Sequence, residues 1–291
     1  MSEAYPLPPV FQERIRAQLG AEADDYFAAL AQPYVRGLRL NPRKPLADPA
    51  ALIEGLGEPV PWQLRTGRYL SQESTAGAQP LHEAGAYYIQ EPSAMAAVAV
   101  LSPRPGERVL DLCAAPGGKS TQIADALEGR GLLVSNEPVP SRAKILSRNL
   151  ERMGVTNGLV VSAEPEQLAP RWAGFFDAIL VDAPCSGEGM FRRHPETRAE
   201  WTEQSPAGCA ARQKRILTSA WAMLRRGGRL VYSTCTLNTE ENEGVIDWMQ
   251  QAFSDCETAA FTLPAGEGAK LDAPGGTLHL YPHRVKGEGH F

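Results

Sequence analysis

The sequence contains no long apolar run, and this shortage excludes several protein classes. Its longest apolar stretch runs only from residue 94 to residue 101, whereas about 20 apolar residues are needed to span a bilayer. The N-terminus also has no basic segment followed by an apolar stretch. We therefore expect neither a transmembrane helix nor a signal peptide, no membrane partner, and a cytoplasmic location.

Cysteines are few and widely spaced. Five occur in 291 residues, at positions 113, 185, 209, 235 and 256, and no Cys-x-x-Cys pair is present. An odd number of dispersed cysteines in a long chain is typical of reduced thiols rather than of a disulfide framework. The absence of paired cysteines also argues against a structural zinc site, so we expect no metal.

Neither sign of charge dominates the sequence as a whole, but charged residues are unevenly distributed along the chain. The net charge is −5, which argues weakly against nucleic-acid binding. Residues 190–230 nevertheless carry nine Lys and Arg against three Glu, while residues 239–257 carry six acids and no base. Such a layout permits one basic face on an acidic protein.

The chain is long enough for about two domains, and its pattern of residue types changes near residues 102–106. Residues 1–102 are rich in proline and predict an N-terminal lobe with one helix over residues 9–30. Residues 103–291 predict an α/β domain with a Rossmann-like, mostly parallel sheet. The expected strands are 108–112, 132–136, 159–161, 178–182 and 229–233, and the expected helices are 120–127, 141–153, 207–224 and one beginning near 239.

A glycine-containing turn follows the first predicted strand and allows two interpretations. Gly118, Lys119 and Ser120 match the end of a phosphate-binding P-loop, but that pattern needs glycine at position 113, where the sequence has cysteine. The alternative is an adenosyl site, in which an acid at the end of the next strand holds the ribose hydroxyls. Glu137, twenty residues beyond Gly117, is placed to be that acid.

Two further predicted strands each end close to a cysteine. Cys185 follows the fourth strand and Cys235 follows the fifth, and ligands bind beyond the carboxyl ends of parallel strands. A buried cysteine is most often an inert small hydrophobe, but two of them beside a nucleoside-type site favour nucleophilic chemistry. A thiolate that adds to C6 of a pyrimidine makes C5 able to accept a methyl group.

These segments together carry a family resemblance. Residues 111–119 (Asp-Leu-Cys-Ala-Ala-Pro-Gly-Gly-Lys), residues 182–192 (Asp-Ala-Pro-Cys-Ser-Gly-Glu-Gly-Met-Phe-Arg) and residues 233–236 (Ser-Thr-Cys-Thr) resemble the two-cysteine RNA cytosine-5 methyltransferases of the NOL/NOP2/Sun family. The resemblance covers roughly residues 86–249. Residues 281–291 are similar to the bacterial branch that modifies small-subunit ribosomal RNA.

The resemblance implies a role for each matching residue. Cys235 is expected to be the nucleophile, Cys185 to assist release of the product, and Asp182 to contact the cytosine N3 edge. Glu137 is expected on the ribose of the cofactor S-adenosylmethionine. The other residues expected to border that cofactor are Cys113, Ala114, Ala115, Pro116, Gly117, Gly118, Lys119 and Asp182.

Two features depart from the family pattern. An acid commonly lies near the adenine after the third strand, but Ser162 and Ala163 occupy that place and the nearest acid is Glu164. Members of the bacterial branch usually continue past residues 287–291 into a further RNA-binding domain, which we expect to be absent here, in a fragment or a natural short form.

The implied substrate is RNA, most simply small-subunit ribosomal RNA, free or in the 30S subunit. We expect Arg192 and Arg193 to contact phosphate because they follow Cys185 closely, with His283 and Arg284 adding to the RNA surface. The N-terminal basic cluster is a further candidate: Arg36, Arg39, Arg43 and Lys44. Three alternatives stay open, namely a transfer-RNA substrate, a P-loop nucleotide hydrolase and a non-catalytic RNA-binding factor.

Overall fold

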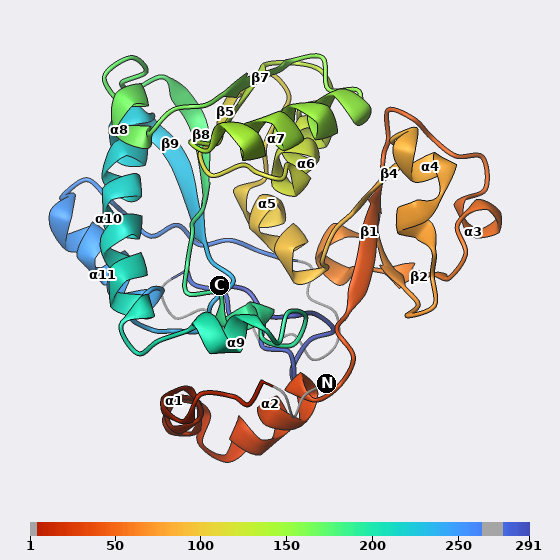
Figure 1. Ribbon diagram of the computed structural model, residues 1–291. Helices are drawn as coiled ribbons and strands as arrows, with labels where there is room; N and C mark the ends of the chain where they lie inside the picture. The colour runs from red at the N-terminus through yellow and green to blue at the C-terminus, as the bar shows by residue number, and fades with distance from the viewer. Residues whose placement is uncertain (1–4, 264–275) are drawn as a thin grey trace.

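The computed structural model describes residues 5–263 and 276–291, and its larger part has three layers (Figure 1). The central sheet is parallel, with the order β7-β6-β5-β8-β9. Its strands are β5 (Arg108–Asp111), β6 (Leu132–Asn136), β7 (Gly158–Val161), β8 (Phe176–Asp182) and β9 (Leu224–Ser233). Counted along the chain, the strand order is 3-2-1-4-5, and the predicted Rossmann-like, mostly parallel sheet is confirmed.

Helices cover both faces of this sheet (Figure 1). One face packs against α5 (Ala96–Leu101), α6 (Gly118–Leu127) and α7 (Pro140–Arg152). The other packs against α8 (Pro165–Leu168), α10 (Ser205–Met223) and α11 (Glu243–Ala252). The strands are rich in Leu, Val and Ile because side chains on both sides of the sheet are buried under helices.

The predicted boundaries of these elements agree closely with the structure, with two instructive differences. β9 begins at Leu224, five residues earlier than predicted, directly after α10. α11 begins at Glu243 rather than near Thr239 because the intervening residues form a turn, in which the Gly244 N–H donates to the Thr239 carbonyl at 2.8 Å.

The N-terminal part differs more from the prediction. The single helix expected over residues 9–30 is wrong, since Gly20 takes a φ of 55° and separates α1 (Pro9–Leu19) from α2 (Ala23–Leu30). A four-stranded antiparallel sheet, which the sequence did not predict, follows in the order β2-β3-β1-β4. The strands are β1 (Arg36–Leu40), β2 (Leu56–Pro59), β3 (Gly67–Leu70) and β4 (Tyr87–Ile89), and two short helices lie between them in the chain, α3 (Pro49–Leu52) and α4 (Pro80–Glu83).

The first two helices lie away from that small sheet and pack near the carboxyl ends of the central strands (Figure 1). Phe11 of α1 and Tyr26 of α2 join a core with Phe191, Leu237 and Tyr281. The N-terminal helices therefore contact the loops that follow β8 and β9.

Short elements and the C-terminal tail complete the fold. The remaining short helices are η2 (Gly20–Glu22), η3 (Pro61–Gln63), η4 (Ala76–Ala78), η5 (Ser93–Met95), η6 (Glu188–Met190) and α9 (Thr197–Glu200). The tail ends beside β9, where Phe291 and Thr234 exchange two backbone hydrogen bonds of 3.0 and 3.1 Å. Within residues 5–263 and 276–291, no helix is both long and apolar enough to cross a membrane.

Candidate active site

Three turns meet at the carboxyl edge of the central sheet. The glycine turn (residues 113–119) follows β5, the Cys185 turn (residues 183–190) follows β8, and the Cys235 turn (residues 234–238) follows β9. Asp182 and Ser233 are partners in the parallel pairing of β8 and β9. Because the two strands end at the same level, the cysteines that follow them are brought together.

The two predicted catalytic thiols lie in contact. Cys185 Sγ is 3.3 Å from Cys235 Sγ, and both side chains are half-buried. The hydrogen bond with Cys235, together with burial, raises the pKa of the Cys185 thiol well above its ordinary value. Cys185 therefore carries its proton at neutral pH, and its S–H can donate to the sulfur of Cys235.

The backbones of the two cysteine turns are also joined. The Gly189 N–H donates to the Cys235 carbonyl at 2.7 Å, and the hydroxyls of Ser186 and Thr236 are 3.0 Å apart. A Cβ at position 189 would lie 2.3 Å from the Cys235 carbonyl oxygen. Glycine is required there because only its lack of a side chain permits this approach.

Asp182 is an ionised carboxylate at the centre of the site. Lys119 Nζ lies 2.7 Å from one of its oxygens, and the Ser233 hydroxyl donates to the other at 2.9 Å. Burial would raise the pKa of Asp182, but the charge of Lys119 and these hydrogen bonds hold it below its ordinary value. The glycine turn is thus tied to the strand that carries the first cysteine turn.

His290, which the sequence analysis did not single out, also faces Asp182. Its Nε2 is 3.6 Å from the carboxylate and has no hydrogen-bond partner among the residues that the structure describes. Burial and the nearby charge of Lys119 lower the pKa of His290 to about 3. The imidazole is therefore neutral at physiological pH, and the contact is not an ion pair.

The glycine turn is shaped by packing as well as by conformation. Gly117 has a φ of 114°, and a Cβ there would lie 3.1 Å from the Leu146 side chain. Three carbonyls of the turn accept side-chain donors: Ala115 from Arg142 at 3.1 Å, Pro116 from Asn149 at 2.8 Å and Gly118 from Arg39 at 3.0 Å. Glycine at position 117 therefore meets both a conformational and a packing requirement of the turn.

Two acids border the glycine turn. Glu137 is almost fully buried, accepts from the Val139 N–H at 3.0 Å and pairs with Arg142 at 3.0 Å. Asp111 accepts from the Ser120 hydroxyl at 2.6 Å, while its second oxygen has no partner among the described residues. Burial raises the pKa of Asp111 to about 7. An unpartnered buried carboxyl oxygen is unusual and fits a ligand that brings a donor or a positive charge.

Other expected cofactor residues are placed around this turn. The Ala114 N–H donates to the Asn136 carbonyl at 2.9 Å, and burial raises the pKa of the Cys113 thiol, so it remains protonated. Glu164 is exposed and caps the start of α8 with Gln167. Its side chain is thereby committed to a helix terminus rather than to a ligand.

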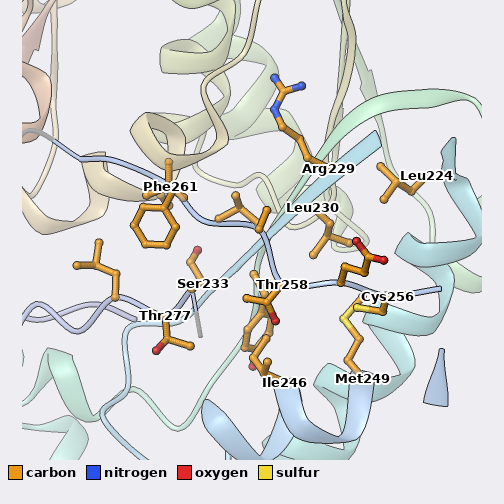
Figure 2. Close-up of a pocket in the computed structure, with 18 of the residues that line it drawn as sticks. Leu224, Arg229, Leu230, Ser233, Ile246, Met249, Cys256, Thr258, Phe261 and Thr277 are labelled. Carbon is orange, nitrogen blue, oxygen red and sulfur yellow. The ribbon is translucent and has the colours of Figure 1, made fainter. Parts of the chain in front are cut away.

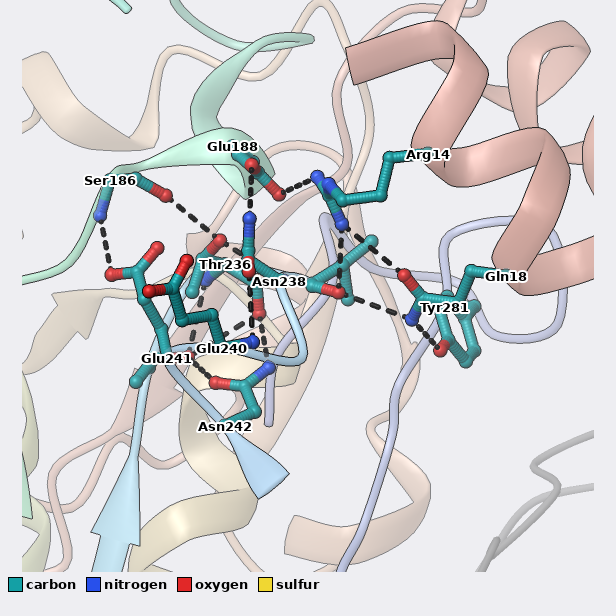
Figure 3. A network of polar contacts seen from close by, with 12 residues as sticks. Arg14, Gln18, Ser186, Glu188, Thr236, Asn238, Glu240, Glu241, Asn242 and Tyr281 are labelled. Atoms are coloured by element: carbon teal, nitrogen blue, oxygen red, sulfur yellow. Dashed lines mark hydrogen bonds and ion pairs between the residues drawn. The ribbon is translucent and has the colours of Figure 1, made fainter. Parts of the chain in front are cut away.

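Buried carboxylates behind the cysteine turns form a network that sequence reasoning missed (Figure 3). Glu188 is fully buried and pairs with Arg14 of α1 at 2.6 Å. Glu241 is equally buried and accepts from the backbone N–H of Ser186 at 2.9 Å. Glu188 lies within residues 182–192, which carry the family resemblance, but Glu241 was marked only by a run of acids after the second cysteine motif, and such a run also describes a solvated surface.

The residues expected to contact RNA have different environments. Arg192 is 5 % exposed and makes a two-bond ion pair with Glu288, with both N···O distances 2.8 Å. Arg193 is exposed and lies 5.5 Å above the Tyr34 ring. Arg192 is therefore buried and Arg193 is accessible, because only Arg192 reaches the buried carboxylate of Glu288.

His283 and Arg284 both contact Glu22, at 3.0 and 2.8 Å, and are largely buried. Side chains of the N-terminal basic cluster also make contacts within the protein. Arg39 is fully buried beside Asp125, and Lys44 donates to two backbone carbonyls at 2.8 Å. These side chains join the lobes of the protein, which a count of charges along the sequence could not distinguish from an RNA surface.

A cavity of about 740 Å³ lies on the outer side of β9 (Figure 2). Leu230 of β9, Met249 of α11 and Phe261 line it, together with Ser233 and His290. Neither Cys185 nor Cys235 lines this cavity, so it is separate from the pair of thiols.

Comparison with known proteins gives two family matches. A family described as 16S rRNA methyltransferase RsmB/F matches residues 98–291, and the N-terminal domain of 16S rRNA methyltransferase RsmF matches residues 7–92. The ribosomal RNA small subunit methyltransferase F of Salmonella paratyphi B is 38 % identical over 282 residues, which cover 92 % of this chain. The chain spans 58 % of the length of that relative.

Solved structures share the fold. A methyltransferase homologue from Pyrococcus horikoshii is 30 % identical with a TM-score of 0.73, over 98 % of this chain and 97 % of its own. NSun6 from Pyrococcus horikoshii, solved with SFG, an analogue of S-adenosylmethionine, has a TM-score of 0.79 at 23 % identity. That likeness covers 97 % of this chain and 96 % of the other.

Proposed function

The chain belongs to the RsmB/F family of 16S rRNA methyltransferases, and from this premise we propose that it methylates C5 of a cytosine in small-subunit ribosomal RNA with S-adenosylmethionine. The observation that carries the proposal is the 3.3 Å contact between Cys185 and Cys235 beside the ionised Asp182. Neither the P-loop alternative nor a non-catalytic factor accounts for two adjacent thiols at this edge of the sheet.

The residues present fit the cofactor. When bound, S-adenosylmethionine supplies an electrophilic methyl group on a positively charged sulfur. We propose that the glycine turn and Glu137 hold it, with the free oxygen of Asp111 directed to a donor or cation of the ligand. Three carbonyls of the glycine turn already have side-chain donors, so these acceptors do not oppose the ligand.

In the first step, the Cys235 thiolate attacks C6 of cytosine, which forms an S–C6 bond and moves the C5–C6 electron pair into the ring. The Cys185 S–H lies within hydrogen-bond distance of the Cys235 sulfur, and this contact supports Cys235 as the nucleophile. Asp182 accepts hydrogen bonds only, so it favours a ring whose N3 has taken up a proton. That proton offsets the charge that develops during addition.

After C5 has accepted the methyl group, a base removes the C5 proton. The freed electron pair restores the C5–C6 double bond, and the S–C6 bond breaks with both electrons going to the sulfur of Cys235. The thiol of Cys185 is placed to donate to this departing sulfur because it lies 3.3 Å away and holds its proton. Because Cys185 holds its proton, we assign nucleophilic attack to Cys235 and assistance of product release to Cys185.

The RNA must present an accessible base. A paired cytosine has to leave its stack to reach a thiol, at a cost of a few kcal/mol, so unpaired or loosened RNA is the expected substrate. We propose that Arg193 contacts phosphate on the rim of the site, since it remains exposed. We also propose that residues 1–102 form a lobe that shapes the RNA side, because α1 reaches the Cys185 turn through Arg14 and Glu188.

The test is transfer of labelled methyl from S-adenosylmethionine to unmodified small-subunit ribosomal RNA, free and in 30S subunits, with the labelled base identified. We expect 5-methylcytosine from the wild-type protein and none from Cys235→Ala. Label in another base, or in transfer RNA alone, would contradict the assigned substrate. Absence of binding to S-adenosylmethionine would overturn the methyltransferase assignment itself.

A further inference from the structure

The Cys185 turn is supported from behind by two buried side chains that the reaction does not use. Glu241 lies in the segment before α11, and Gln213 lies on α10. Both are fully buried. One carboxylate oxygen of Glu241 accepts from the Ser186 N–H at 2.9 Å and from the Gln213 side-chain amide at 2.9 Å.

The same amide of Gln213 also donates to the Pro184 carbonyl at 3.0 Å. The two side chains therefore bond to the residues immediately before and after Cys185. No hydrogen bond joins either side chain to Cys235, whose turn is held by its own polar groups and by the tail residue Phe291. The Tyr232 hydroxyl fixes the backbone of Glu241 by donating to its carbonyl at 2.7 Å.

We propose that Glu241 and Gln213 are positioning residues that hold the Cys185 sulfur against Cys235 for the release of methylated product. The inference rests on the proposed function, because it assigns the pair to the step in which Cys185 acts. It predicts a selective defect: formation of the covalent adduct and methyl transfer should survive loss of the support, while breakdown of the adduct should slow.

Burial and charge agree with this assignment. Burial raises the pKa of Glu241, and the charge of Glu241 is one of the influences that raise the pKa of Cys185. A fully buried carboxyl is costly to maintain unless it makes specific hydrogen bonds. In Glu241 one oxygen accepts from the Ser186 backbone of the Cys185 turn and from the Gln213 side chain, and the ion pairs among the described residues do not include Glu241.

The experiment compares Glu241→Met, which removes the acceptor at similar size, with Glu241→Gln, which keeps one acceptor oxygen. Each variant is assayed with small-subunit ribosomal RNA for the first methyl transfer in a single turnover, for steady-state turnover, and for protein–RNA adduct on denaturing gels. We expect Glu241→Met to lower steady-state turnover about 10- to 100-fold, because a small displacement of the Cys185 thiol from its reactive position can cost this much in rate. The variant should also accumulate adduct. Its first transfer should stay near the wild-type rate, and Glu241→Gln should recover most of the turnover.

Glu240→Gln is the matched control, because Glu240 is the adjacent glutamate and is exposed. It should behave as wild type. If Glu241→Met folds poorly, as thermal unfolding would reveal, Gln213→Met provides the second test: it removes the donor to Pro184 but leaves the bond between Glu241 and Ser186. It should accumulate the same adduct.

The outcomes separate the two proposals. Failure of the wild-type protein to transfer methyl would overturn the proposed function, and the inference with it. Transfer by wild type together with adduct in Cys185→Ala, but no adduct in any folded Glu241 or Gln213 variant, would overturn the inference alone. An equal loss of first transfer and of turnover would also overturn it, since that pattern indicates general damage to the site.

Discussion

The two halves of the site differ in the contacts that most clearly support them. Around the glycine turn, side-chain donors bind backbone carbonyls, as Arg142 does with Ala115. Behind the cysteine turns, buried carboxylates accept from donors instead, as Glu241 does from Ser186 and Glu188 does from Arg14. The first arrangement draws on α7 and, over a longer range, on Arg39 of β1, whereas the second includes the contact between Arg14 and Glu188, which are 174 residues apart in the sequence.

The difference teaches where the protein is vulnerable. A buried carboxylate that loses its partner is left with an uncompensated charge, which is far more costly than an exposed carbonyl that loses one donor. Loss of Arg14 or Glu241 should therefore disturb the cysteine half more than loss of Arg142 disturbs the glycine half. The following predictions test that separation.

The largest effect is expected within the cysteine half itself. Cys235→Ala should lower methyl transfer at least about a thousandfold because the ring can no longer be activated by a covalent bond. Binding of S-adenosylmethionine, measured by calorimetry, should be unchanged, since Cys235 has no bond to the glycine turn. Loss of cofactor affinity in the same variant would contradict the separation of the halves.

Next in size is the buried pair between α1 and the Cys185 turn. Arg14→Met leaves Glu188 buried without its cation and should destabilise the protein by about 3 kcal/mol, measured as the shift in urea unfolding. Arg16→Met is the control, because Arg16 is 56 % exposed and its partner Asp24 is 84 % exposed. It should cost less than about 0.5 kcal/mol. Equal costs for the two variants would contradict the importance of the buried carboxylate.

Asp111 of the glycine half forms no ion pair with the residues that the structure describes, and this gives a pH test. Its folded pKa of about 7 is raised above the unfolded value, so the folded state binds more protons between about pH 4 and 7. The free energy of unfolding from this group therefore falls as pH rises through that window, on the order of 1 kcal/mol per pH unit. Asp111→Asn should make the slope shallower, whereas an unchanged slope would remove Asp111 as its source.

The smallest expected effect is at the rim. Arg193→Ala should weaken RNA binding severalfold and reduce the slope of log affinity against log salt by about 1, as loss of one phosphate contact does. Arg226→Ala, an exposed arginine near the start of β9, is the control and should leave the slope unchanged. An equal change in both variants would indicate nonspecific attraction rather than a contact at the site.

The contrast between the halves also explains what the sequence could predict. The strand at residues 132–136 was located correctly because it begins with a short apolar run of Leu132, Leu133 and Val134. The cysteines follow strand ends that the pattern alone can place. The family resemblance then identified the three turns. Their relation in space follows from the parallel pairing of β8 and β9.

Other features depended on partners that no local pattern reveals. Arg192 and Arg193 are identical in type and adjacent in sequence, yet Glu288 of the tail buries only Arg192. The N-terminal sheet was missed because its strands are only three to five residues long and prolines lie between them. Gly20 ends α1 through a positive φ that a helical pattern does not display.

The measurement that tests the account most directly is the chemical identity of the protein–RNA adduct. Cys185→Ala should accumulate an adduct with small-subunit ribosomal RNA in the presence of S-adenosylmethionine, and mass spectrometry should locate the cross-linked nucleotide on Cys235. The double variant Cys185→Ala and Cys235→Ala should form none. An adduct on any other residue, or one that persists in the double variant, would contradict the division of labour between the two thiols.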